Sequence, residues 1–346
     1  MKKKYNAQQK EAIEHDDGTA LIVAGAGTGK TTVLIGRLQH LIEKKLAGTD
    51  EILLLTFTEK AAGEMYDRAV EILPYGYVDL WINTFHGFCE RLLREHALDI
   101  GLDPSFKLVN DTEQWILIKK NLDKFNLDYY RPLGNPNKFI FELVKHFSRL
   151  KDEYIEPKEY LQFVENLIQG GDQMLSGRQI TSHRSIKLKV ESKNVILNEA
   201  KRNEESREVK VKDNSTGSFS AQLADQDDMS SQELSRLEEL ANAYHAYNKL
   251  LLDNGYLDFG DLINYCIKLF QERPNILKYY QEKFKYIMVD EFQDTNWSQY
   301  ELLKQLVKSH PPEADQSKNN KELLIEKSIK SKVNKKKIEN RKSKID

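Results

Sequence analysis

The chain has 346 residues, enough for one large or two ordinary domains, and its 40% hydrophobic content is sufficient for a buried core. It contains no apolar run of about 18 residues and no apolar signal sequence after the N-terminus, so we expect a cytoplasmic protein without membrane spans. The formal net charge of −2 excludes an argument for nucleic-acid binding from overall charge. The two cysteines, Cys89 and Cys266, exclude a disulfide framework, and we expect both in the core.

Four short apolar runs, at residues 19–24, 51–56, 78–82 and 286–289, predict β-strands. Each run is mostly continuous rather than alternating, which is typical of strands buried on both faces of a parallel sheet. Helical periodicity follows the first and third runs. Alternation of strands and helices predicts an α/β domain, with a parallel sheet flanked by helices.

The remaining segments predict insertions into this sheet domain. Residues 101–169 carry Phe, Leu, Tyr and Lys at helical spacing, which indicates an inserted helical subdomain between the first segment, 1–100, and the rest. Residues 170–232 are polar with few aromatics, which predicts a disordered insertion. Helical periodicity returns in 233–308, which ends the sheet domain, and the Lys-rich tail, 309–346, is expected to be solvated rather than a nucleic-acid arm.

A glycine-rich loop lies between the first predicted strand and the helix after it. Glycines allow successive backbone N–H groups to surround phosphate oxygens at a helix N-terminus, while Lys30 would reach the β- and γ-phosphates. The Thr31 hydroxyl would ligate Mg²⁺. The strict P-loop pattern has Gly where Ala24 stands, but the flanking strand and helix argue against a chance glycine-rich turn. The predicted cradle consists of Ala24, Gly25, Ala26, Gly27, Thr28, Gly29, Lys30, Thr31 and Thr32.

An acidic pair, Asp290 and Glu291, directly follows the fourth predicted strand. Asp290 would hold Mg²⁺, and Glu291 would orient and deprotonate the attacking water. Alone, two carboxylates after a strand are more often a solvated turn. In a chain that also has a P-loop, the pair indicates hydrolysis or transfer of the terminal phosphate of a nucleotide.

Five segments in order resemble the motifs of superfamily-one DNA helicases of the UvrD/Rep/PcrA type. The DEFQD sequence at residues 290–294 resembles the DExx box, and Asn6, Gln9 and Ala12 resemble the Q motif. Residues 56–65 with Arg68 are similar to motif Ia, 83–89 to motif Ib and 257–262 to motif Ic. Glu59 departs from the motif Ia pattern, where Asn is common.

The resemblance implies a RecA-like P-loop ATPase domain that uses ATP and Mg²⁺, with 101–169 in the place of the family's 1B subdomain. Gln9 would read the adenine edge, Gln293 would couple nucleotide state to DNA binding, and Arg37 would contact the nucleotide. Motifs Ia to Ic would line a path for single-stranded DNA. The predicted DNA contacts are Phe57, Thr58, Lys60, Thr84, Phe85, His86, Asp258 and Phe259. Phe57 and Phe85 have core packing as an alternative role, and His86 a structural hydrogen bond.

The resemblance ends after the DExx box and its following helix, so the sequence predicts only the first half of a two-domain motor. We expect binding of ATP and of single-stranded DNA or a duplex junction, in replication, repair or recombination, without unwinding by this chain alone. One alternative is a non-catalytic or split-motor subunit completed by a partner chain that supplies a second RecA-like domain. Another, a small-molecule P-loop kinase or a GTPase, leaves motifs Ia to Ic unexplained.

Overall fold

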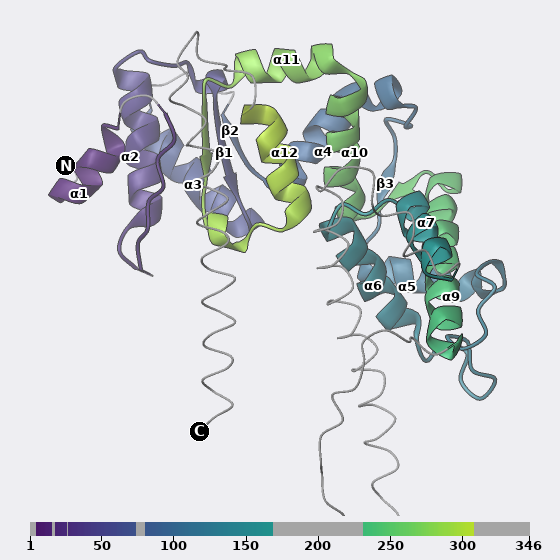
Figure 1. Cartoon of the computed structure of the whole chain (residues 1–346). Coiled ribbons are helices and arrows are strands. Elements are labelled where there is room, and N and C mark those ends of the chain that lie inside the picture. Colours follow the sequence, from purple (N-terminus) through teal and green to yellow (C-terminus); the bar gives the residue numbers. More distant parts are fainter. Residues whose placement is uncertain (1–4, 16–17, 26, 74–79, 169–230, 308–346) are drawn as a thin grey trace, which may run out of the picture. The chain divides into compact units, whose positions relative to one another are not determined.

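The computed structural model of the chain describes residues 5–15, 18–25, 27–73, 80–168 and 231–307 (Figure 1). Residues Met1–Leu306 form one compact unit, and Val307–Asp346 form another, of which only Val307 is described. The predicted disordered insertion, apart from its last two residues, and the predicted Lys-rich tail lie outside the described residues.

The compact unit has a sheet part and a helical part, each built from two stretches of the chain. The sheet part contains α1 (Ala7–Ile13), α2 (Lys30–Glu43), η1 (Thr49–Glu51), β1 (Ile52–Thr56), α3 (Glu59–Ile72), β2 (Trp81–Thr84), α4 (Phe85–His96), α10 (Phe259–Glu272), α11 (Pro274–Lys283), β5 (Tyr286–Val289), η4 (Phe292–Asp294) and α12 (Trp297–Val307). The helical part and its connections contain η2 (Ala97–Ile100), β3 (Lys107–Leu108), α5 (Asp111–Lys120), η3 (Leu122–Lys124), α6 (Ile140–Asp152), α7 (Pro157–Ile168), α9 (Ser231–Asp253) and β4 (Tyr256–Leu257).

The sheet has the strand order β2-β1-β5, and both pairings are parallel. Leu54 in the central strand is in register with Ile82 on one side and with Met288 on the other. Because all three strands run the same way, the residues that follow their carboxyl ends gather at one edge of the sheet. That edge carries the segments predicted to bind nucleotide and DNA.

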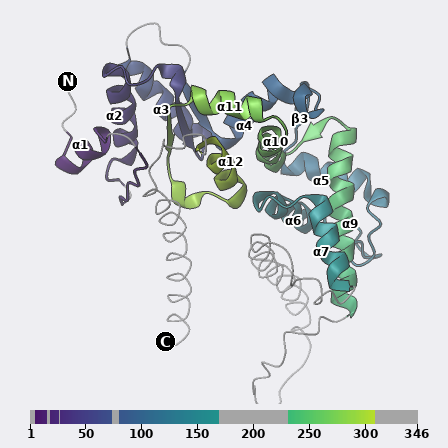
Figure 2. The ribbon, with the colours of Figure 1, turned by 45° about the horizontal axis from the view of Figure 1, so that its top comes forward.

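Helices cover both faces of the sheet, as Figures 1 and 2 show. Leu53 and Leu55 point to one face and pack with α4, α10 and α12, whereas Ile52, Leu54 and Met288 point to the other and pack with α2 and α3. All five side chains are at most 7% exposed. Burial on both faces explains the continuous apolar runs. The α/β class predicted from those runs is confirmed.

The prediction of a first strand at residues 19–24 is wrong. Residues 18–25 form no strand in the described part of the chain, and Leu21 and Val23 are 65% and 85% exposed. A strand is stable only when its backbone N–H and C=O groups pair with a neighbour, which an apolar pattern of side chains does not report. The third predicted strand begins at Trp81 instead of residue 78, and residues 74–79 lie outside the described part.

The helical part has its own core, to which α9 contributes together with α5, α6 and α7. Phe147 of α6 stacks on Tyr247 of α9, with ring centroids 5.0 Å apart. The short strands β3 and β4 pair in parallel, Lys107 with Tyr256, and so hold the two stretches of chain together. The helical return predicted at the start of 233–308 corresponds to α9, whose buried face packs in the helical part.

Candidate nucleotide and nucleic-acid site

The glycine loop leads directly into the first turn of α2. Gly27 and Gly29 have φ angles of 74° and 93°, a left-handed backbone region that favours glycine, and Gly29 is the N-cap of α2. The Thr28 hydroxyl donates to the carbonyl of Gly25 at 2.8 Å, which closes the loop on itself. Lys30 and Thr31 therefore occupy the N-terminal turn of a 14-residue helix, where backbone N–H groups favour an anion. Ala26 lies outside the described residues.

The acidic segment after β5 lies against this loop. The Lys30 ammonium is 2.9 Å from one carboxylate oxygen of Glu291 and donates to the other at 3.0 Å. Glu291 has a φ of 46°, which is uncommon for a residue with a side chain. Gln293 also donates to the Glu291 carboxylate. The structure thus brings together Lys30, Glu291 and Gln293, the three predicted catalytic residues.

The two carboxyl groups of the acidic pair have different environments. Burial raises the pKa of Asp290, and the neighbouring Glu291 charge adds to the effect, although its bond from the Glu291 N–H opposes it. Hydrogen bonds from Gln293 and Lys30 lower the pKa of Glu291. A cation near Asp290 would relieve the cost of its buried charge, and a hydroxyl and a carboxylate are ligands that Mg²⁺ accepts. Thr31 and Asp290 therefore fit the predicted metal role.

The N-terminal helix α1 lies against the loop through Gln9. Asn6 and Gln9 form a capping box, and the Gln9 side-chain amide donates to the carbonyl of Thr28 at 3.2 Å. Gln9 thus lies beside the cradle, and its contact with the adenine edge stays a prediction. Arg37, predicted to contact the nucleotide, donates to the carbonyls of Ala12, Ile13 and His15. Its charge compensates the free carbonyls at the C-terminus of α1 and holds α1 against α2, and its contact with the nucleotide stays a prediction.

The segments after β1 and β2 lie side by side at the carboxyl edge of the sheet. Phe57 and Phe85 are in edge contact, with ring centroids 5.7 Å apart. Phe85 is 1% exposed and so has no face for a base, whereas Phe57 is half-buried. Thr58 caps α3 by accepting from the Ala61 N–H at 3.1 Å. Lys60 is exposed on the first turn of α3, where it can meet a phosphate.

Two of the predicted DNA contacts, Thr84 and Asp258, are buried helix caps instead. The buried Thr84 hydroxyl accepts from the Gly87 N–H at 3.0 Å and donates to Glu59 at 2.6 Å, so it caps α4. The buried Asp258 carboxylate caps α10 by accepting from the Asp261 N–H at 3.0 Å. Since polar groups inside a protein are satisfied by partners, residues of these types at strand ends serve the fold before they serve a ligand.

His86 and Phe259 bring the segments that resemble motifs Ib and Ic together. Their rings meet edge to face, with centroids 5.7 Å apart, and Phe259 is 46% exposed. Burial lowers the pKa of His86 and outweighs the opposing charges of Glu59 and Asp258, so its imidazole is neutral at physiological pH. An exposed aromatic ring supported by a second ring suits base stacking. Phe57, Phe259 and His86 are therefore the predicted DNA contacts that the fold leaves available, with Lys60 and Thr58.

The residues of this site lie within the part of the chain that matches known proteins. The family model of the UvrD/REP helicase N-terminal domain matches residues 5–313. The chain belongs to this family. It is 34% identical over 304 residues to the ATP-dependent DNA helicase PcrA of Bacillus subtilis (strain 168), covering 87% of this chain and 31% of that protein.

Other relatives give the same coverage. The chain is 32% identical over 304 residues to the ATP-dependent DNA helicase PcrA of Staphylococcus epidermidis, covering 88% of this chain and 32% of that protein. It thus spans about a third of the length of the curated relatives it matches. Within the described residues of this UvrD/REP domain, no helix is both long and apolar enough to cross a membrane. Cys89 and Cys266 are both buried, as predicted.

Sequence reasoning missed a buried charged cluster at the N-terminus of α10. Lys151 of α6 is 1% exposed and bonds to Asp258 and Asp261. A signal existed, because Lys151 continues the buried row of Val144 and Phe147 at helical spacing. A lysine on the apolar stripe of a helix needs a buried acidic partner, so the pattern alone could have raised the question.

Proposed function

We propose that the chain binds Mg²⁺-ATP and single-stranded DNA as the nucleotide-binding first part of an ATP-dependent DNA translocase or helicase. The observation that carries the proposal is the contact between Lys30 and Glu291. It joins the P-loop to the DExx box across 261 positions of sequence. Membership of the UvrD/REP domain family, whose cited relatives are named as ATP-dependent DNA helicases, supports the same conclusion.

Each group at this junction has a chemical task in the proposed site. Lys30 would leave Glu291 for the β- and γ-phosphates, since a doubly charged phosphate attracts the ammonium more strongly than one carboxylate. Thr31 and Asp290 would hold Mg²⁺, which neutralises phosphate charge when bound. Glu291, released from Lys30, would accept a proton from the attacking water while Gln293 keeps its carboxylate oriented.

The DNA path is proposed along the exposed residues at the carboxyl edge of the sheet. Phe259 and Phe57 offer ring surface for bases, and Lys60 and Thr58 offer partners for phosphate oxygens. Both proposed sites lie at the same edge of the sheet, so single-stranded DNA on this path would run close to the DExx box. Unwinding is not part of the proposal, because the chain spans about a third of its helicase relatives.

Two titrations test the proposal on the 346-residue chain. Calorimetry with the non-hydrolysable analogue AMPPNP and Mg²⁺ should give saturable binding that Lys30→Ala abolishes. Fluorescence anisotropy with labelled oligothymidylate should give saturable binding that Phe259→Ala weakens and Lys30→Ala preserves. Absence of both interactions in the folded wild-type chain would overturn the proposal. Nucleotide binding without DNA binding would instead favour a small-molecule P-loop kinase or a GTPase.

A second candidate is a subunit that a partner chain completes. Exposed Leu21 and Val23, beside the P-loop, favour it, because contiguous exposed apolar side chains mark interaction surfaces. In that case, DNA-stimulated ATP hydrolysis by the 346-residue chain should appear only after addition of a polypeptide that carries the part of a PcrA-like relative beyond the matched region. Strong hydrolysis by the purified chain alone would exclude this candidate.

A further inference from the structure

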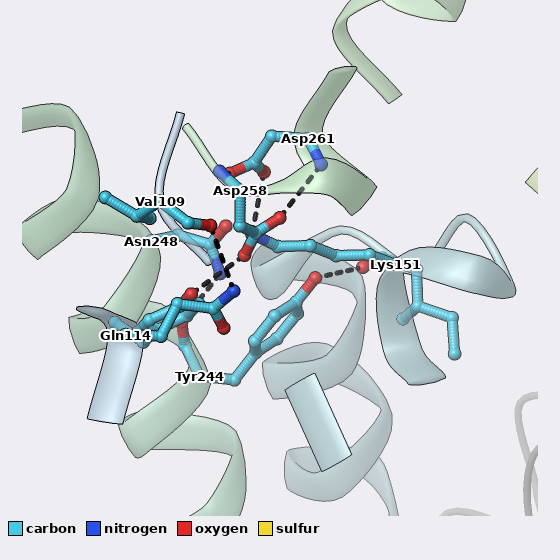
Figure 3. Close-up of polar contacts among 9 residues, drawn as sticks. Val109, Gln114, Lys151, Tyr244, Asn248, Asp258 and Asp261 are labelled. Carbon is cyan, nitrogen blue, oxygen red and sulfur yellow. Dashed lines mark hydrogen bonds and ion pairs between the residues drawn. The ribbon is translucent and has the colours of Figure 1, made fainter. Parts of the chain in front are cut away.

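The last turn of α6 enters the interior between α9 and the N-terminus of α10. The Lys151 ammonium contacts Asp258 at 2.6 Å and Asp261 at 2.7 Å, and all three side chains are at most 7% exposed (Figure 3). Tyr247 of α9 donates its hydroxyl proton to Asp258 at 2.8 Å. A lysine of the helical subdomain thus holds both carboxylates of the capping box that begins α10.

Gly260 permits this close approach. A Cβ atom at residue 260 would lie 2.7 Å from the Cβ and 3.0 Å from the Cδ of Lys151, closer than packed carbon atoms allow. The lysine stem therefore lies directly on the backbone of motif Ic. Any displacement of α6 must carry Asp258 and Asp261 with it or separate a buried ammonium from its carboxylates.

The next residue of α6 makes a second attachment, this time beside the nucleotide site. Asp152 accepts a hydrogen bond from the Asn296 side-chain amide at 2.8 Å. The Asn296 side-chain oxygen in turn accepts from the Gln299 N–H at 2.9 Å, so Asn296 caps α12. Asn296 lies two positions after Asp294, the end of the DExx box. One helical turn therefore holds motif Ic with one side chain and the segment after the DExx box with the next.

Motif Ic connects this turn to the proposed DNA path. Phe259 follows Asp258 directly, and its ring rests against His86 of motif Ib. Single-stranded DNA that stacks on Phe259 would act on the backbone that Lys151 holds. A nucleotide that moves Glu291 would act on the segment that Asp152 holds. The two attachments are on adjacent residues of one helix, which gives a shift of either segment a direct route to the other.

We propose that Lys151 and Asp152 are positioning residues that couple DNA occupancy at motif Ic to nucleotide occupancy at the DExx box. The inference rests on the proposed function, since it requires both ligands to bind. It assigns to the helical subdomain a part in communication between the sites, in addition to any contact that it makes with DNA. Coupling of this kind is reciprocal, so each ligand changes the affinity of the other by the same factor.

The test measures that factor in the 346-residue chain. The Kd for labelled oligothymidylate is determined by anisotropy with and without saturating AMPPNP and Mg²⁺, in the wild type, in Asp152→Ala and in Asp152→Asn. In the wild type we expect the nucleotide to change the DNA Kd by at least about fivefold, the lower end of typical coupling. Asp152→Ala, which removes the acceptor for Asn296, should bring the ratio to about one while each ligand alone binds within about twofold of wild type.

Two comparisons separate coupling from general damage to the fold. Asp152→Asn keeps an oxygen that can accept from Asn296, so it should retain the wild-type ratio. Glu142→Ala removes one carboxylate from an exposed position on the same helix and should leave the ratio unchanged. The inference is overturned if the wild type binds both ligands without coupling, or if Asp152→Ala retains the ratio. Failure of the wild type to bind either ligand would instead overturn the proposed function.

Discussion

Replacement of Lys151 by methionine isolates the charge of the buried cluster. Methionine fills much of the space of the lysine stem but leaves Asp258 and Asp261 in the interior without a cation. Removal of one partner of a buried ion pair costs about 3 to 5 kcal/mol, because the remaining charge has lost its solvation and its partner. With a sensitivity of about 2 to 4 °C per kcal/mol, the Tm should fall by about 6 to 20 °C.

The Lys151→Met substitution should also change how stability depends on pH. In the wild type, Asp258 would have a raised pKa from burial, but the charge and hydrogen bond of Lys151 outweigh burial and lower it. Burial, with the charge of Asp258, already raises the pKa of Asp261 to about 6 beside Lys151, and without Lys151 burial dominates at both carboxyls and holds their pKa values above the unfolded ones. Stability of Lys151→Met is then greatest below the unfolded pKa and is lost as pH rises, so the deficit should be larger at high pH than at low pH.

Urea unfolding at several pH values measures this deficit. Lys120→Met makes the same chemical change on an exposed residue and should shift stability by no more than about 0.5 kcal/mol. A triple variant with Asp258→Asn and Asp261→Asn in addition should recover much of the loss, because neutral amides need no buried cation. A deficit below about 1 kcal/mol at high pH, or one independent of pH, would refute the reasoning.

Three further outcomes follow from the same contacts. Glu291→Gln removes the charge that pairs with Lys30, and this partly exposed ion pair is worth up to about 1 kcal/mol. Lys30 is then freer to bind phosphate, so calorimetry should show up to about fivefold tighter AMPPNP binding. Weaker binding would contradict this. Phe259→Ala should weaken oligothymidylate binding at least about fivefold by anisotropy, since stacking is worth about 1 to 3 kcal/mol per base, whereas Phe141→Ala, on a similarly exposed ring, should not. Burial, together with the Glu153 charge, raises the pKa of Asp152 to about 6, so wild-type stability should increase relative to Asp152→Asn by roughly 1 to 2 kcal/mol as pH falls from about 8 to 4; an unchanged difference would exclude the shift.

The features that could be predicted from the sequence are those that a few neighbouring residues determine. The glycine loop before a helix was readable because positive φ angles at Gly27 and Gly29 need residues without a side chain. The acidic pair could be predicted because it directly follows an apolar strand of the sheet. A P-loop needs an acidic partner for the metal, and the contact between Lys30 and Glu291 joins the loop to the acidic pair.

The errors have a common physical origin. The sequence patterns identified residue types at the correct edge but not which side chains point to solvent. Phe85 faces the core, and Thr84 satisfies the backbone of the helix that it begins. Likewise, the apolar run at 19–24 specified side-chain character but not a hydrogen-bonding neighbour, and the segment is not a strand. Both kinds of information depend on contacts between parts of the chain that are distant in sequence.

The Lys151 cluster shows why such contacts resist prediction and why they matter. Lys151 and Asp258 are 107 positions apart, and each has an ordinary local explanation, as a helix residue and as a helix cap. Only the fold makes the lysine a partner of the cap. Because Asp152 is bonded to Asn296 in the same turn, the helical insertion and the motifs of the sheet domain cannot be treated as separable units. Variants that loosen α6 should therefore alter communication between the ligand sites before they alter either site itself.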